Sequence, residues 1–89
     1  MENNFVTVNY EVRDSLGISN NEYVACYLIY QMSKNTGWAE ISRTYLAERV
    51  GISERGLLLL LGRMEAINLI ERNAQFKFKT TSKWIKAIN

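Results

Sequence analysis

The 89-residue sequence predicts a mainly α-helical fold with a small β-hairpin: a three-helix core followed by two short strands. Two observations support this α+β assignment. An Ile-Ser pair precedes a helix-compatible segment at three places, where the serine is suited to cap the helix and the isoleucine to pack onto it. Near the C-terminus, the run FKFKT alternates apolar and polar residues, which indicates a strand.

Composition limits the chain to one small domain with a single core, because 47% of its residues are hydrophobic and 22% are charged. No apolar run approaches the roughly 20 residues that a membrane-spanning helix needs. The sequence has one cysteine and no histidine, which excludes a zinc site and a Ser-His or Cys-His catalytic set. We therefore expect a protein of a reducing cytoplasm that is no enzyme and uses no cofactor or metal.

The net charge of +2 conceals an asymmetry along the chain. Residues 1–45 hold three basic and five acidic side chains, whereas residues 46–89 hold eight basic and four acidic ones. Such a basic C-terminal half is typical of a surface that meets nucleic acid, and it is equally compatible with an ordinary solvated strand and tail.

The N-terminal segment reads as a strand or extended arm. In FVTVNYEV, residues 5–12, large apolar side chains recur at every second position, which indicates extended backbone with one face buried against the body or a partner chain. Residues 13–17 are then expected to turn into the first core helix.

The first core helix is predicted over residues 20–33. Ser19 and Glu22 form a capping box, in which each side chain accepts a hydrogen bond from the other residue's backbone N–H. The residues that follow are apolar almost all round, so the helix is expected to be central and covered on more than one side. The side chains expected to face the other helices are Val24, Leu28 and Met32.

Tyrosines at positions 23, 27 and 30 form a second stripe on this helix. An aromatic stripe at helical spacing is usually core, and here we expect it to receive the N-terminal arm or another subunit. Cys26 lies in the same run and is expected to be a small buried apolar side chain.

Two further helices are predicted over residues 43–50 and 54–67. Ser42 and Ser53 are placed to cap them, and Gly51 suits the left-handed residue that ends the earlier one. Residues 38–41 fit a short strand before them. The helical spacing predicts a shared core that contains Leu28, Leu46, Val50, Leu57, Leu61 and Met64.

A β-hairpin is predicted next, with strands at 69–72 and 76–80 around the turn Asn73-Ala74-Gln75. Asn68 is expected to take the left-handed conformation that ends the third helix. In the second strand, alternation places Phe76, Phe78 and Thr80 on the core side and Lys77 and Lys79 outside. Thr81 or Ser82 is expected to cap a last short helix that carries Trp84, Ile85 and Ile88.

The segment LAERVGIS at 46–53, the apolar positions 57, 61, 64 and 67, and NLIE at 68–71 resemble the winged helix-turn-helix of bacterial and phage DNA-binding proteins. The likeness is to N-terminal domains of phage and plasmid replication initiators and replisome organisers. It implies one domain over 1–89, with an arm (1–18), a three-helix core (19–68), a wing (69–80) and a short C-terminal helix (81–89). It also implies double-stranded DNA as partner and a nucleoid-associated place in the cytoplasm of a bacterial host.

The third helix, which enters the DNA major groove in this family, departs from the family's pattern. At about 100° per residue, its inward side holds Leu57, Leu60, Leu61 and Met64. Its opposite face holds Arg55, Leu59, Gly62 and Ala66, with Leu58 and Arg63 beside them. Base edges are read by hydrogen-bonding side chains, and leucines offer at most contact with a thymine methyl group.

Two hypotheses follow. In the first, the domain holds DNA mainly through phosphates, with little sequence information. The residues expected to contact DNA are Ser42, Arg43, Thr44, Ser53, Arg55, Arg63, Arg72, Lys77 and Lys79.

In the second hypothesis, the scaffold serves as a protein-protein interaction or dimerisation module whose interface is the apolar third helix. The residues expected at that interface are Leu58, Leu59, Gly62, Tyr23 and Tyr27. The partner would be a second copy of the chain or a replication or regulatory protein. A third arrangement remains open, in which the N-terminal arm or the segment around Trp84 covers the two leucines within one chain.

Overall fold

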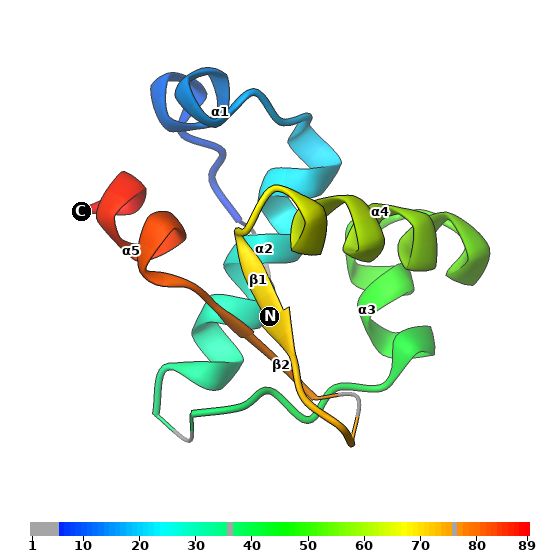
Figure 1. The fold of residues 1–89 in the computed structure, drawn as a ribbon. Helices are drawn as coiled ribbons and strands as arrows, with labels where there is room; N and C mark the ends of the chain where they lie inside the picture. The colour runs from blue at the N-terminus through cyan, green and yellow to red at the C-terminus, as the bar shows by residue number, and fades with distance from the viewer. Residues whose placement is uncertain (1–5, 36, 76) are drawn as a thin grey trace, which may run out of the picture.

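The computed structural model describes residues 6–35, 37–75 and 77–89 (Figure 1). Within these ranges the chain forms a three-helix core, a two-stranded hairpin and two short flanking helices, which confirms the predicted α+β architecture. In order, the elements are α1 (Tyr10–Leu16), α2 (Asn20–Ser33), α3 (Arg43–Val50), α4 (Glu54–Ala66), β1 (Ile70–Arg72), β2 (Phe78–Thr80) and α5 (Ser82–Ile88).

The three predicted serine caps are all present. Ser19, Ser42 and Ser53 each accept a hydrogen bond from the backbone N–H three residues further on. At the first of them the Glu22 side chain also accepts from the Ser19 backbone N–H over 2.8 Å, which completes the capping box. Helices α2 and α3 have the predicted bounds, and α4 ends one residue earlier than predicted.

Left-handed residues end two of these helices as predicted. Gly51 has φ = 90° between α3 and α4, and Asn68 has φ = 66° before β1. Asparagine tolerates this conformation because its short polar side chain bonds locally. The tight break at Gly51 sets α3 and α4 as the two helices of a helix-turn-helix (Figure 1).

The hairpin pairs β1 with β2 in antiparallel register, with Ile70 opposite Thr80 and Arg72 opposite Phe78. The strand predicted at 38–41 is reduced to a single bridge between Ala39 and Phe78. The expected inward placement of Phe76 lies outside the described residues, while Phe78 is half-buried and Thr80 buried.

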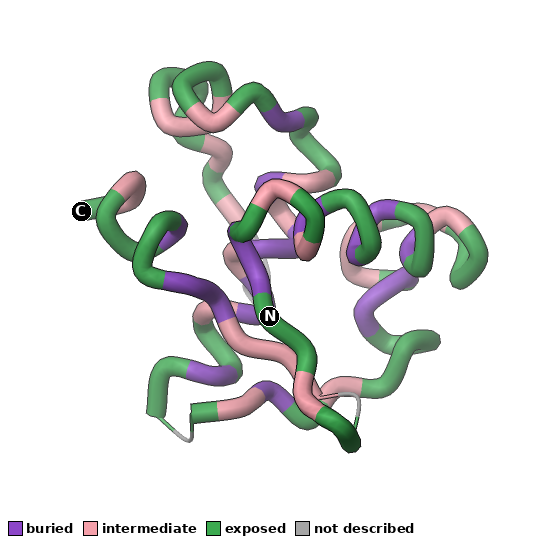
Figure 2. Tube along the Cα trace, in the orientation of Figure 1, coloured by how far each residue is buried: buried purple, intermediate pink, exposed green. Residues whose placement is uncertain are grey.

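The N-terminal strand prediction is wrong from Tyr10 onward. Residues 10–16 form the helix α1, and Val6 to Asn9 precede it without regular structure. Asn9 caps α1 by accepting hydrogen bonds from two backbone N–H groups in its first turn, and Gly17 ends it with φ = 69°. The expected burial of one side holds only in part, since α1 carries no buried residue (Figure 2).

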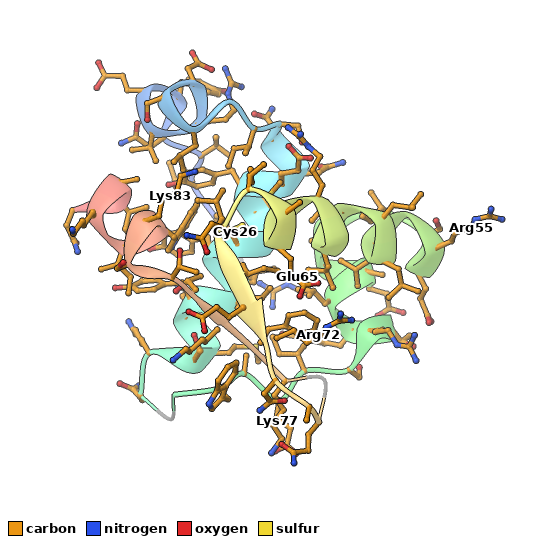
Figure 3. The ribbon with its side chains drawn as sticks, in the orientation of Figure 1. Cys26, Arg55, Glu65, Arg72, Lys77 and Lys83 are labelled. Atoms are coloured by element: carbon orange, nitrogen blue, oxygen red, sulfur yellow. The ribbon has the colours of Figure 1, made fainter. Side chains whose placement is uncertain are left out.

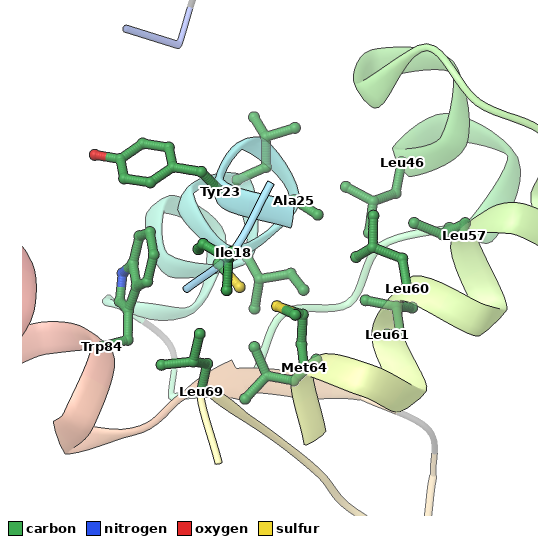
Figure 4. Close-up of a cluster of buried hydrophobic side chains, with 14 of the residues drawn as sticks. Ile18, Tyr23, Ala25, Leu46, Leu57, Leu60, Leu61, Met64, Leu69 and Trp84 are labelled. Atoms are coloured by element: carbon green, nitrogen blue, oxygen red, sulfur yellow. The ribbon is translucent and has the colours of Figure 1, made fainter. Parts of the chain in front are cut away.

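The core gathers between α2, α4, the hairpin and α5 (Figure 4). The predicted core residues Leu28, Leu46, Leu57, Leu61 and Met64 are all buried. Three predictions of inward placement need correction, because Val24 and Val50 are only half-buried and Met32 is exposed.

Cys26 is fully buried in this core, as the sequence predicts. Burial, with a smaller effect from the charge of Glu22, raises the pKa of its thiol to about 12. A thiol that stays protonated is unreactive near neutral pH, so Cys26 acts as a small apolar side chain.

Helix α5 covers the tyrosine stripe of α2 within the same chain. The Trp84 ring lies 5.2 Å from that of Tyr23 and 6.5 Å from that of Tyr27, measured between ring centroids. Only 3% of Tyr23 is exposed, so its predicted place at a protein interface is wrong, while Tyr27 is half-buried. Trp84 therefore packs on α2, and the idea that it covers Leu58 and Leu59 is also wrong.

The start of α5 differs in one detail from the prediction. Thr81 is the N-cap residue, but its side chain makes no cap hydrogen bond. The Thr81 hydroxyl instead donates to the backbone oxygen of Asn68 over 2.7 Å, which ties the residue after β2 to the connection between α4 and β1.

Candidate nucleic-acid interface

A cleft of about 610 Å³ opens between the start of α3, the outer side of α4 and the hairpin. Its apolar floor includes Leu61 and Phe78, and the side chains of Arg43, Arg72 and Glu65 also line it. In Figure 3 the Glu65 and Arg72 side chains lie close together where α4 meets the hairpin. The structure thus brings predicted DNA contacts from α3 and from the hairpin to one surface.

Two exposed arginines mark the starts of the helix-turn-helix helices. Arg43 is the first residue of α3, and Arg55 is the second residue of α4, from which it projects outward (Figure 3). Neither arginine forms an ion pair within the described residues. Helix N-termini carry a partial positive charge, so each arginine adds to a field that attracts phosphate.

The serines predicted to contact DNA, Ser42 and Ser53, lie at the same two helix starts. Each hydroxyl oxygen accepts the capping hydrogen bond of its helix. Both residues are exposed, so the hydroxyl hydrogen of each remains available to donate to a phosphate oxygen.

Thr44 is already engaged, because its hydroxyl donates to Glu54 Oε2 over 2.7 Å. This hydrogen bond joins the first turn of α3 to the first residue of α4. A carboxylate at this point also repels phosphate, which makes Thr44 a weaker DNA contact than the sequence alone predicts.

Basic side chains of the hairpin are held by neighbours. The Arg72 Nε lies 3.4 Å from Glu65 Oε2, and the Lys77 Nζ lies 3.5 Å from Glu40 Oε2. Lys79 places its Nζ 4.8 Å from the centroid of the Trp38 ring. Arg72 lines the cleft, whereas Lys77 lies with Glu40 and Trp38 at a separate hollow. The two carboxylates also compete with any phosphate for Arg72 and Lys77.

Arg63 is placed apart from the other predicted DNA contacts. Its Nε donates to Glu22 Oε2 over 2.7 Å and its Nη2 donates to the backbone oxygen of Gly17 over 3.1 Å. The Arg63 guanidinium thus joins α4 to the start of α2 and serves the fold.

Glu22 accepts that contact with most of its side chain covered. Burial by itself raises the pKa of the Glu22 carboxyl, but hydrogen bonds from Arg63 and from the Ser19 backbone outweigh it. The net result is a pKa below the ordinary value. The hydrogen bond to Glu22 in turn raises the pKa of Arg63.

The outer face of α4 is apolar, as predicted. Leu58 is 46% exposed and Leu59 is 72% exposed. Gly62 lies on the same face, and a Cβ added there would meet no atom within 4 Å. The helix therefore presents an uncovered apolar strip where a base-reading helix carries donors and acceptors.

Three residues of this surface, Glu40, Glu65 and Trp38, were not predicted from the sequence. Each contacts a cation that was predicted to bind DNA, from a position far along the chain or on another element. The signal available in the sequence was Glu40, an acidic residue in the segment 38–41. This segment bridges to the lysine-rich strand through Ala39 and Phe78.

No protein-family model matches the chain, and no curated protein is similar enough in sequence to match it. No helix of the described residues is long and apolar enough to cross a membrane. Among solved structures, the chain is similar to a multiple antibiotic-resistance repressor (MarR) from Listeria monocytogenes, with a TM-score of 0.67 and 18% identity. The match covers 86% of this chain and 51% of the repressor chain, so this chain spans about half of that protein's length. At this identity the likeness shows the fold, and the fold is a winged helix-turn-helix.

Proposed function

We propose that this chain is a DNA-binding winged-helix domain that holds double-stranded DNA largely through its phosphates. The observation that carries the proposal is the placement of Arg43 and Arg55, exposed and without ion pairs in the described chain, at the starts of the two helix-turn-helix helices. The sequence resemblance adds that the domain belongs to a replication or regulatory protein of a phage or mobile element. It then acts in the cytoplasm of a bacterial host, as a binding module and not as an enzyme.

Phosphate contacts dominate in this proposal because α4 has little with which to read bases. Leu58, Leu59, Gly62 and Ala66 occupy the exposed side of the helix, and none of their side chains forms a hydrogen bond. Contacts from arginine and lysine to phosphates set position and affinity without sequence information. The domain should therefore bind many duplex sequences with similar affinity.

The paired cations limit that affinity. Before Arg72 or Lys77 grips a phosphate, it must exchange its own carboxylate, Glu65 or Glu40, for a phosphate oxygen. Such exposed ion pairs are worth little, so the exchange costs little free energy. Arg43 and Arg55 need no such exchange, and we assign them the leading role.

The experiment is a fluorescence anisotropy titration of a labelled duplex at several salt concentrations. For the wild type, log Kd should rise with log salt concentration, with a slope of about 0.9 per phosphate neutralised. Changing both Arg43 and Arg55 to alanine should weaken binding to all duplexes and lower that slope by about two. The matched control removes two lysines of α5, Lys83 and Lys86, and should leave binding nearly unchanged. Equal effects of the two double variants would remove the helix starts from the mechanism.

A second candidate function is favoured by the exposure of Leu58 and Leu59 beside an apolar-floored cleft. Apolar strips of this kind mark surfaces that bind protein. In this function the winged helix serves as an interaction module, and α4 buries its leucines against another chain. Failure of the anisotropy titration, together with self-association or capture of a partner through α4, would favour this candidate over DNA binding.

A further inference from the structure

The outer face of α4 is complementary to itself. Arg55, Leu59, Gly62 and Ala66 fall on one line of the helix at about 100° per residue, and all four are exposed. Leu59, the largest apolar side chain of the strip, lies one turn before Gly62 and two turns before Ala66. In a dimer with two-fold symmetry, parallel helices would place the two Leu59 side chains opposite each other, whereas antiparallel helices place each Leu59 opposite the recess of the other copy.

We propose that α4 packs antiparallel against α4 of a second copy of this chain, about a two-fold axis near residues 60 and 61. Each Leu59 then enters the recess that Leu59, Gly62, Arg63 and Ala66 form on the other copy. These positions are spaced i, i+3, i+4 and i+7, which is the hole that receives a knob in helix pairs. This inference rests on the second candidate function and names its partner.

Gly62 supports a close approach of the two helices. Glycine weakens a helix interior, and nothing around Gly62 in the described chain requires one, since an added Cβ would meet no atom within 4 Å. The monomer thus has room for a side chain at this position. Because position 62 carries no side chain, Leu59 of the second copy can approach the backbone of α4 closely there.

Charge favours the antiparallel direction. Arg55 and Glu65 lie at opposite ends of α4 (Figure 3), so antiparallel packing brings Arg55 of each copy toward Glu65 of the other. Parallel packing would instead bring the two Arg55 side chains together. Antiparallel helix dipoles are also favourable to each other.

The cleft next to α4 can accommodate Leu58, the second exposed leucine of the helix. Leu58 lies on the cleft side of the strip, where Leu61, Gly62 and Glu65 also line the cavity of about 610 Å³. The same two-fold axis directs Leu58 of the second copy toward this cavity. Pairing therefore covers both exposed leucines of each copy, and it covers the face of α4 that points at DNA in the proposed function.

Sedimentation velocity from about 1 µM to about 1 mM protein tests the pairing. The wild type should change from monomer to dimer within this range. Leu59→Gln, a change on a side chain that the monomer leaves exposed, should raise the dimer Kd at least about tenfold, as should Gly62→Leu. The matched control Ile85→Gln removes an exposed apolar side chain from α5 and should leave the dimer unchanged. A monomeric wild type, or a loss of dimer in the control equal to that in Leu59→Gln, would overturn the proposal.

Cross-linking gives an independent measurement. Cys26 is buried, so Leu59→Cys adds the one exposed thiol, close to its own copy across the two-fold axis. Mild oxidation should yield a covalent dimer from Leu59→Cys and little from Ile85→Cys. The reverse yield would place the interface on α5 and refute pairing through α4.

Addition of duplex DNA then separates this inference from DNA binding. If both proposals hold, DNA should disperse the dimer and bind the covalent Leu59→Cys dimer more weakly than the reduced protein. A chain that dimerises through α4 without binding DNA would contradict only the DNA proposal. A chain that binds DNA and stays monomeric at all concentrations would contradict only the pairing.

Discussion

Trp84 offers the sharpest test of how the C-terminal helix is attached to the domain. It is the one buried residue of α5, and its ring packs on those of Tyr23 and Tyr27 of α2. Figure 4 shows Trp84 beside Tyr23. Trp84→Ala removes that anchor and should cost roughly 3–5 kcal/mol of unfolding free energy. A domain of this length is stable by roughly 4–13 kcal/mol. The variant should therefore release α5, expose the two tyrosines and come close to unfolding.

The indole nitrogen makes the prediction more specific. Trp84 Nε1 is buried and has no hydrogen-bond partner among the described residues. Trp84→Phe therefore breaks no hydrogen bond, and it relieves the cost of a buried unpaired donor, about 1–3 kcal/mol. This gain offsets most of the ring volume that is lost, so Trp84→Phe should stay within about 1 kcal/mol of the wild type.

Urea denaturation followed by far-UV circular dichroism measures both variants, and Trp38, whose ring lies beside Lys79 of β2, remains as a fluorescent probe of the hairpin. Trp84→Ala should lose much of the unfolding free energy, and Trp84→Phe should lose little. A loss below about 1 kcal/mol for Trp84→Ala would show that α5 is not docked on α2. Equal, large losses for both variants would show that Nε1 makes a hydrogen bond that matters.

Three further predictions concern the core, the pH dependence and the wing. Leu61→Ala should cost roughly 2–5 kcal/mol in the same denaturation experiment, and a loss below about 1 kcal/mol would mean that α4 is rotated from the described register. Glu22→Gln should be less stable than the wild type above pH 4.5, where Glu22 is charged and contacts Arg63. Once the pH falls below the lowered pKa of Glu22, that contribution is lost and the two proteins should be equally stable. A difference in unfolding free energy that persists in acid would show another cause. Lys77→Ala combined with Lys79→Ala should weaken DNA binding to all sequences alike and flatten the salt dependence by about two units, whereas unchanged binding would remove the wing from the mechanism.

Local start and stop signals made most of the fold predictable. Ser19, Ser42 and Ser53 fix where the core helices begin, since each supplies a side-chain acceptor for backbone N–H groups that otherwise lack one. Gly51 and Asn68 adopt the left-handed conformation that their residue types allow. Signals of this kind act within a few residues, so they can be recognised without knowledge of the tertiary structure.

The N-terminal segment shows where such signals conflict. Alternating apolar residues from Val6 to Val12 have the period of a strand, while Asn9 and Gly17 are the cap and stop of a helix. The helix prevails because Asn9 satisfies two free N–H groups of its first turn. A strand at this place would also need a partner, and the hairpin of the described chain contains only β1 and β2.

The candidate site was predictable in composition and less so in its electrostatics. Exposure of Arg43, Arg55 and Leu59 follows from helical periodicity, which the sequence shows directly. The partners of Arg63 and Lys77 are Glu22 and Glu40, which lie far away along the chain. Such ion pairs depend on how α2, α4 and the hairpin pack together, and no local pattern in the sequence records them.

An NMR titration of the isotope-labelled chain with duplex DNA tests whether the helix starts and the wing bind DNA through its phosphates. Backbone amide signals should shift around Arg43 at the start of α3, Arg55 near the start of α4 and Lys77 in the hairpin. Signals of α1 and α5 should remain in place, and raising the salt concentration should reverse the shifts. No shifts at low salt, or shifts confined to α1 and α5, would contradict the account.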